Sequence, residues 1–92
     1  MTNWKACVLT LPELGQLDFP NWRGAYARLF AELEELRLGY VDGLGADDDS
    51  DRHINANVAL VDHAISDLRT LPYGADYSFT VGANHYDLKV AA

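Results

Sequence analysis

Five aspartates fall within ten consecutive residues that contain no base: Asp42, Asp47, Asp48, Asp49 and Asp51. Carboxylate oxygens are the ligands that Ca²⁺ and Mg²⁺ prefer, and they also accept hydrogen bonds from Lys and Arg. Asp47, Asp49 and Asp51 have the alternating spacing of the first ligands of an EF-hand loop. That loop requires glycine at its sixth position and glutamate at its twelfth, where this chain has Arg52 and Val58. The sequence therefore excludes an EF-hand, and we predict no dedicated metal site.

An aspartate run ahead of a helix also has a structural explanation. A carboxylate at a helix N-terminus accepts hydrogen bonds from free backbone N–H groups and interacts favourably with the helix dipole. We expect Asp49, Ser50 or Asp51 to be this cap. One cap requires one side chain, and neighbouring carboxylates repel each other, so capping leaves most of the cluster unexplained. The surplus charge favours contact with a basic surface of another protein.

The other chemically active side chains are scattered along the chain. His53, His63 and His85 lack the spacing of zinc sites, and we expect His63 to be exposed one turn from Asp67. Cys7 lies in an apolar stretch, where a thiol is normally an inert part of the core. The chain has neither a nucleophile elbow nor a glycine-rich phosphate loop. The sequence predicts no catalytic residue, no metal, no cofactor and no enzymatic activity.

Composition bounds the class of protein. A chain of 92 residues, 49% of them hydrophobic, is predicted to form one domain that spans residues 1–92. Its single cysteine allows no internal disulfide, and no stretch resembles a signal peptide or a membrane span. We therefore expect a cytoplasmic protein with no membrane partner. The net charge of −7 disfavours direct binding of nucleic acid, because such binding needs Lys and Arg to neutralise phosphates.

Hydrophobic periodicity predicts two helices after an N-terminal strand. Residues 4–11 are rich in strand-forming residues, whereas residues 11–20, with two prolines and a glycine, indicate a connecting loop. Asp18 or Asn21 is expected to cap the first helix, which Gly39 and the following residues 40–45 should close. Its apolar stripe is Trp22, Tyr26, Leu29, Leu33, Leu36 and Tyr40. The stripe of the second helix is Ile54, Val58, Val61, Ile65 and Leu68.

The C-terminal residues 76–81 and 85–90 alternate with period two, which predicts a β-hairpin. Gly82 and Ala83 then form a type II′ turn, with Gly82 supplying the positive φ. This turn sets three cross-strand pairs: Phe79–Tyr86, Tyr77–Leu88 and Asp76–Lys89. Apolar pairing and charge pairing agree on this register.

These elements predict an α+β fold of order β-α-α-β-β. We expect both helices to pack on one face of a three-stranded antiparallel sheet, with residues 42–51 as an acidic interhelical loop. The position of the first strand in that sheet stays open.

Two tyrosines join the aspartates in the predicted partner-binding set. Tyr40 and Tyr73 lie near helix ends, where partial exposure is expected, and tyrosine is common at protein interfaces. In size and charge the chain resembles small phage-encoded inhibitors, anti-CRISPR proteins among them, that bind and block nucleic-acid-handling complexes. The resemblance implies an inhibitor or modulator whose acidic loop meets a basic surface. The alternative is an assembly subunit that forms a homo-oligomer through a strand edge or its aromatic face.

Overall fold

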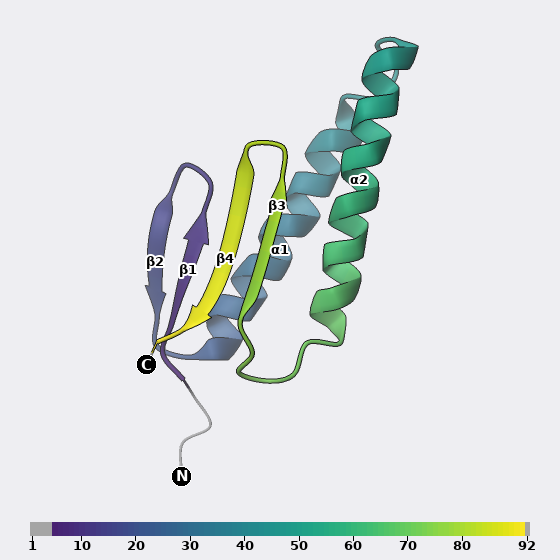
Figure 1. Ribbon diagram of the computed structural model, residues 1–92. Helices are drawn as coiled ribbons and strands as arrows, with labels where there is room; N and C mark the ends of the chain where they lie inside the picture. The colour runs from purple at the N-terminus through teal and green to yellow at the C-terminus, as the bar shows by residue number, and fades with distance from the viewer. Residues whose placement is uncertain (1–4, 92) are drawn as a thin grey trace. The chain divides into compact units, whose positions relative to one another are not determined.

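The computed structural model describes residues 5–91 and shows an α+β chain of order β-β-α-α-β-β (Figure 1). Its elements are β1 (Cys7–Leu11), β2 (Gly15–Phe19), α1 (Trp22–Asp42), α2 (Asp48–Arg69), β3 (Tyr77–Val81) and β4 (Asn84–Val90). The chain divides into two compact units. The sheet unit holds the described residues up to Leu29 and those from Leu71 onward, and the helical unit holds Phe30–Thr70.

The sheet has four antiparallel strands in the order β2-β1-β4-β3, so the predicted three strands and the predicted element order were wrong. The error lies at residues 11–20, where β2 forms instead of a loop alone. Leu17 pairs with Leu9 and Phe19 pairs with Cys7. The two prolines bracket β2 instead of interrupting it, because Pro12 lies in the preceding turn and Pro20 follows its last residue. Trp4, the predicted start of the first strand, lies outside the described residues.

One face of the sheet carries the core of the sheet unit. Alternate residues of β1 are buried, and Leu9 and Leu88, which face each other across β1 and β4, are both fully buried. The buried apolar residues of this unit are Cys7, Leu9, Leu11, Trp22, Ala25, Leu29, Val81, Tyr86 and Leu88. The indole N–H of Trp22 donates to the carbonyl of Ala75 over 2.8 Å, which satisfies the polar atom of this buried ring.

The hairpin of β3 and β4 has the predicted register. Tyr77 pairs with Leu88, Phe79 with Tyr86 and Val81 with Asn84, which leaves Gly82 and Ala83 as the turn. Gly82 has a φ of 58°, and Ala83 is not among the described residues with positive φ, as a type II′ turn requires. Before β3, the carboxylate of Asp76 accepts a hydrogen bond from the Val90 amide over 2.8 Å.

The start of α1 is fixed by one of the two predicted caps. The Asn21 side chain accepts a hydrogen bond from the Gly24 amide over 2.8 Å, so Asn21 is the cap and Asp18 is a residue of β2. The helix continues through Gly39 and ends at Asp42, within the residues 39–45 that were predicted to close it. Gly39 lies inside the helix because glycine only weakens a helix interior and does not by itself terminate one.

In the helical unit, most buried positions belong to the predicted stripes; Ala64 is buried outside them, and Leu36 and Tyr40 of the α1 stripe are half-buried. Leu33 of α1 is fully buried, and α2 buries Val61, Ala64, Ile65 and Leu68. Ile54 and Val58, at the N-terminal half of the α2 stripe, are half-buried. The amide of Thr70 bonds to the Asp67 carbonyl over 3.2 Å and closes the helix.

Candidate binding surface at the acidic tip

The five aspartates lie where α1 ends and α2 begins, a region that we call the acidic tip (Asp42, Asp47, Asp48, Asp49 and Asp51). Two backbone hydrogen bonds close the end of α1, from Gly43 to Tyr40 over 3.0 Å and from Leu44 to Val41 over 3.1 Å. Gly45 then turns the chain with a φ of 101°, a conformation that favours glycine. The short connection therefore holds Asp42 close to the first turn of α2.

Asp47 is the cap of α2, so the predicted cap at Asp49, Ser50 or Asp51 was wrong. Its carboxylate accepts hydrogen bonds from the Ser50 amide over 2.8 Å and from the Ser50 hydroxyl over 3.1 Å. The backbone bond from Ser50, and next its hydroxyl bond, lower the pKa of Asp47 below its usual value of 3.8. The four aspartates around Ser50 have the same side chain, and only the extended backbone of Asp47 makes it the cap.

Asp51 also has a structural role. Its carboxylate accepts a hydrogen bond from the Gly45 amide over 2.8 Å, and its own amide donates to the Asp47 carbonyl over 2.9 Å. These bonds tie the first turn of α2 to the preceding loop. Asp47 and Asp51 therefore stabilise the conformation of the connection. This structural role explains why these two positions carry a carboxylate.

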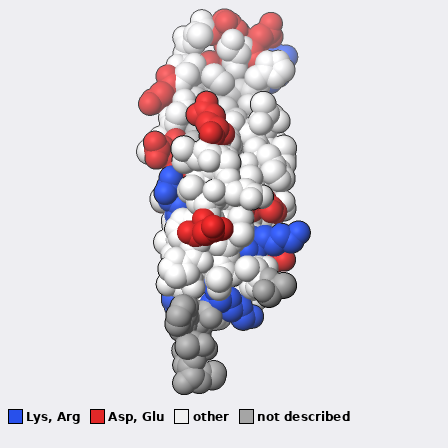
Figure 2. All heavy atoms as spheres, turned by 90° about the vertical axis from the view of Figure 1, so that its left-hand side faces the viewer, with Lys and Arg blue, Asp and Glu red and all other residues white. Residues whose placement is uncertain are grey.

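The remaining three carboxylates have little to do within the fold. Asp49 lies 3.8 Å from Arg52, and their side chains are 89% and 80% exposed, so this ion pair contributes little stability. Among residues 5–91, no side chain bonds to the carboxylates of Asp42 or Asp48. Acidic side chains gather at this end of the helical unit in the space-filling view (Figure 2). Asp48 and Asp49 lie in the first turn of α2, where negative charge interacts favourably with the helix dipole. Asp42, Asp48 and Asp49 are nevertheless exposed, and neither the cap nor the loop bond needs them.

An apolar rim, which the sequence analysis missed, lies beside these charges. Leu38 is 61% exposed, Val41 36% and Leu44 38%. Leu38 and Val41 are one turn apart on α1, and Leu44 follows in the loop. These residues fall outside the stripe that defines the buried face of α1, and this displacement is the sequence signal that could have identified them. Exposed aliphatic side chains beside charge are typical of protein contact surfaces.

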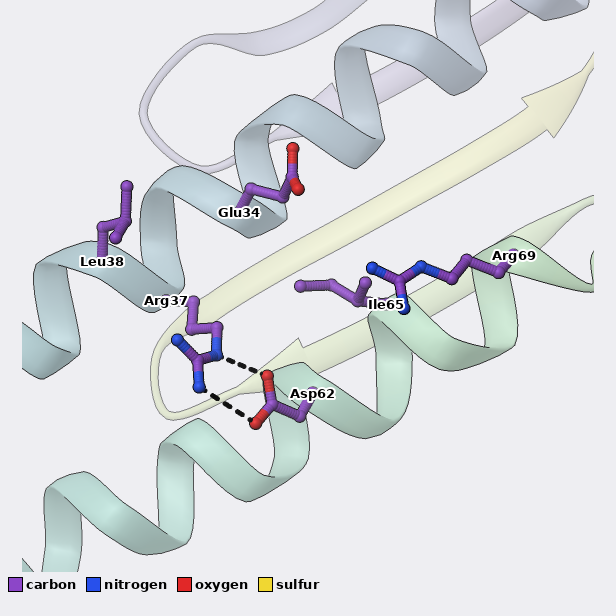
Figure 3. A pocket seen from close by; sticks show the side chains of 6 residues that line it. All are labelled: Glu34, Arg37, Leu38, Asp62, Ile65 and Arg69. Atoms are coloured by element: carbon purple, nitrogen blue, oxygen red, sulfur yellow. Dashed lines mark hydrogen bonds and ion pairs between the residues drawn. The ribbon is translucent and has the colours of Figure 1, made fainter.

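A groove between α1 and α2 begins at the same rim (Figure 3). It has a volume of about 550 Å³ and is lined by Glu34, Arg37, Leu38, Asp62, Ile65 and Arg69. The Arg37 guanidinium bridges the helices, with its Nε 2.5 Å and its terminal nitrogen 3.5 Å from the two oxygens of Asp62. Arg69 lies over the Phe30 ring, 5.9 Å from its centroid. Three of its four charged side chains are paired or stacked, so the groove offers less free charge than the acidic tip.

The two predicted tyrosines belong to different compact units. Tyr40 is half-buried at the end of α1, and its carbonyl accepts the bond from Gly43. Tyr73 belongs to the sheet unit, where its ring makes an edge contact with Trp22 at 5.1 Å and lies under the Arg23 guanidinium at 5.4 Å. Tyr40 therefore lies near the acidic tip, whereas the structure does not assign Tyr73 to it.

His63 and Cys7 have the surroundings that the sequence predicted. His63 is exposed and its Nδ1 lies 3.4 Å from the Asp67 carboxylate, while the Nδ1 of His85 lies 2.7 Å from the Thr80 hydroxyl. Cys7 is only 2% exposed, and burial, with a smaller effect from Asp76, raises the pKa of its thiol. Within residues 5–91, no group of three His, Cys, Asp or Glu side chains is arranged to hold a metal ion. Neither α1 nor α2 is long and apolar enough to span a membrane.

Comparison with known proteins adds no relative: no protein family, curated protein or solved structure matches this chain.

Proposed function

We propose that this chain is a small protein-binding module that uses its acidic tip to engage a basic surface on a nucleic-acid-handling complex and so inhibits or modulates that complex. The observation that carries the proposal is the position of Asp42, Asp48 and Asp49. These three carboxylates are exposed, they lie at the two helix ends that flank one short connection, and neither the α2 cap nor the hydrogen bond that closes the loop uses them. Like charges held this close destabilise a free protein slightly, and a basic partner would relieve the repulsion.

The composition of the surrounding surface supports a protein partner. Charge complementarity accelerates encounter and excludes wrong partners, but tight binding also needs apolar contact that excludes water. The exposed Leu38, Val41 and Leu44 supply such contact next to the charge. The partner surface that fits this arrangement has Lys or Arg side chains around an apolar depression.

A nucleic-acid-handling partner follows from the charge pattern. Proteins that bind DNA or RNA expose clusters of Lys and Arg that neutralise phosphates, and closely spaced carboxylates can occupy those clusters. Binding by the acidic tip should then compete with nucleic acid and weaken as ionic strength rises. Inhibition requires no catalytic group in the chain.

The test compares two variants with the same net charge. Asp42→Asn/Asp48→Asn/Asp49→Asn removes the three spare carboxylates and keeps the Asp47 cap and the Asp51 loop bond. The matched control, Glu13→Gln/Asp18→Asn/Glu35→Gln, removes three exposed carboxylates elsewhere. Each protein is immobilised and used to capture partners from a lysate of the source organism over a series of salt concentrations, with double-stranded DNA as competitor.

We expect wild type and the control to retain the same basic complex, the tip variant to lose it, and both salt and DNA to displace it. Equal retention by the tip variant, or equal loss by the control, would refute a role for the acidic tip. Circular dichroism of each variant verifies that the helices are intact, so a lost interaction is not mistaken for unfolding.

A further inference from the structure

The sheet of the sheet unit has two edge strands that differ in kind. β2 forms one edge and β3 forms the other (Figure 1). An edge strand presents a row of backbone N–H and C=O groups that can pair with another chain. The composition of the edge determines whether such pairing is opposed or allowed.

The hairpin register identifies which groups of β3 are available. Val81 and Asn84 flank the two-residue turn and form a hydrogen-bonded pair, so the bonded positions of β3 are the alternate residues 81, 79 and 77. The backbone groups of Ser78 and Thr80 consequently point away from β4. Within the sheet unit, no described loop forms a backbone hydrogen bond with either residue. Their side chains are exposed and bond to the neighbouring strand, Ser78 to Asp87 over 3.0 Å and Thr80 to His85 over 2.7 Å.

The two edges differ in the devices that prevent pairing. Natural proteins protect exposed edges with charges, prolines, bulges or short strands. β2 has Asp18 at an outward-pointing position, and Pro12 and Pro20 bracket the strand. β3 has the sequence YSFTV, with no charge and no proline, and it pairs with β4 without a bulge. β3 is therefore a regular, uncharged strand whose edge is open to a further strand.

We propose that β3 pairs with β3 of a second copy of this chain, antiparallel about a two-fold axis through Phe79. In this register Ser78 of each copy lies opposite Thr80 of the other, and their outward N–H and C=O groups form four hydrogen bonds. The sequence Ser78-Phe79-Thr80 is nearly symmetric about Phe79, as a two-fold interface between identical strands requires. Asp76 lies opposite Gly82 of the second copy, so no like charges face each other across the seam.

Side-chain packing favours the same register. The two Phe79 rings face each other in a non-hydrogen-bonded pair, where side chains approach closely. Phe79 is half-buried in the free chain, and its centroid lies 6.3 Å from that of Tyr86. Pairing would extend this aromatic row across the seam and join two four-stranded sheets into one continuous sheet. The proposal uses the sheet unit alone, so it stands or fails independently of the acidic tip.

A charge exchange tests the register directly. In Ser78→Lys/Thr80→Lys each new lysine faces a lysine of the second copy, and in Ser78→Glu/Thr80→Glu glutamates face each other. Both substitutions lie on the exposed face of β3. Sedimentation equilibrium should show a dimer for wild type at micromolar concentration, monomers for each variant alone, and a heterodimer when the two variants are mixed. A strictly monomeric wild type, or a failure of the mixed variants to associate, would overturn the proposal.

A second pair of variants separates edge pairing from general destabilisation. Proline lacks the N–H group, so Thr80→Pro removes one outward donor of β3 without removing a bond to β4. Asp18→Pro makes the same change at an outward position of β2. We expect Thr80→Pro to lower the dimer fraction at least tenfold and Asp18→Pro to leave it unchanged. Dimers retained in Thr80→Pro, or lost equally in both variants, would contradict pairing through β3.

Discussion

The two hairpins of the sheet are alike in topology and differ in their turns. Both are antiparallel, and β2 and β3 are five residues each. The turn between β3 and β4 has two residues, with Gly82 at a φ of 58°. The turn between β1 and β2 has three residues, and Glu13 occupies it with a φ of 70°, the one positive value among the described non-glycine residues.

The contrast shows which hairpin is stabilised by its own turn and which is stabilised by the neighbouring strand. Around Glu13 the Leu14 amide donates to the Pro12 carbonyl over 2.8 Å, which is a γ-turn with its central residue in a strained conformation. Such a turn does not direct a hairpin by itself. β2 is held by β1, which is itself secured on its other side by β4 through the fully buried pair of Leu9 and Leu88. The β3–β4 turn stabilises its hairpin. The β1–β2 turn is strained, and its hairpin forms because the pairing of β1 with β2 and β4 offsets that strain.

The largest expected effect is the loss of stability when a buried leucine of the sheet is truncated, and it should be greater in β4 than in β2. Leu88→Ala in β4 removes a fully buried side chain and should destabilise the protein by about 2–5 kcal/mol. Leu17→Ala in β2 removes a half-buried one at the sheet edge and should cost about half as much or less. Urea unfolding followed by circular dichroism measures both. Equal losses would mean that β2 is as deeply integrated as β4.

A glycine substitution tests the local turn. Gly82→Ala places a side chain at positive φ, where nothing lies within 4 Å of the new Cβ, so only backbone strain of about 1–2 kcal/mol opposes it. The control is Gly39→Ala inside α1, where nothing lies within 4 Å of the new Cβ either and alanine should stabilise by about 0.5–1 kcal/mol. Opposite shifts in the urea midpoint are expected. A neutral Gly82→Ala would show that the turn does not drive the hairpin.

The strained turn gives the reverse prediction. Glu13→Gly should stabilise the protein by up to about 1 kcal/mol, because glycine adopts positive φ without strain, although it also loses more entropy on folding. Leu14, at the next position, has a negative φ, so the control Leu14→Gly should not stabilise the protein. Urea midpoints again provide the measurement. Destabilisation by Glu13→Gly would indicate that the turn does contribute to hairpin formation.

The smallest effect concerns β1, the strand that secures β2. Burial raises the pKa of Cys7 above its usual value of 9.0, so the folded chain keeps the thiol protonated while the unfolded chain loses the proton. The contribution of the Cys7 thiol to the free energy of unfolding is fully present below pH 9 and declines as the pH rises above that value. Urea unfolding from pH 8 to pH 10 should show a decline that Cys7→Ala reduces. An unchanged decline in that variant would mean that the strand opens before the thiol ionises.

Prediction from sequence succeeded where pattern and local chemistry agreed. The α1 and α2 stripes span several turns each, and the Gly82 turn has the residue type that its conformation needs. β2 was missed because its alternation covers only five residues between two prolines, and its partner strand, not its own turn, stabilises it. The cap of α2 was predicted at the wrong residue because neighbouring aspartates are chemically equivalent. Only the extended backbone of Asp47 distinguishes it. The apolar rim was missed because the prediction considered only the apolar residues on the stripes, and Leu38 and Val41 lie outside them.

The pairing of β1 with β4 also has a consequence for protein synthesis. β1 is the first of the six elements to be made and β4 is the last, yet they lie side by side, with the Ala91 amide bonded to the Ala6 carbonyl over 2.9 Å. A nascent chain can form the helices early, but β1 lacks its β4 partner, and β2 lacks the support that this pairing gives to β1, until residues 84–90 leave the ribosome. Ribosome-bound chains stopped before β4 should therefore recruit chaperones that chains containing β4 release.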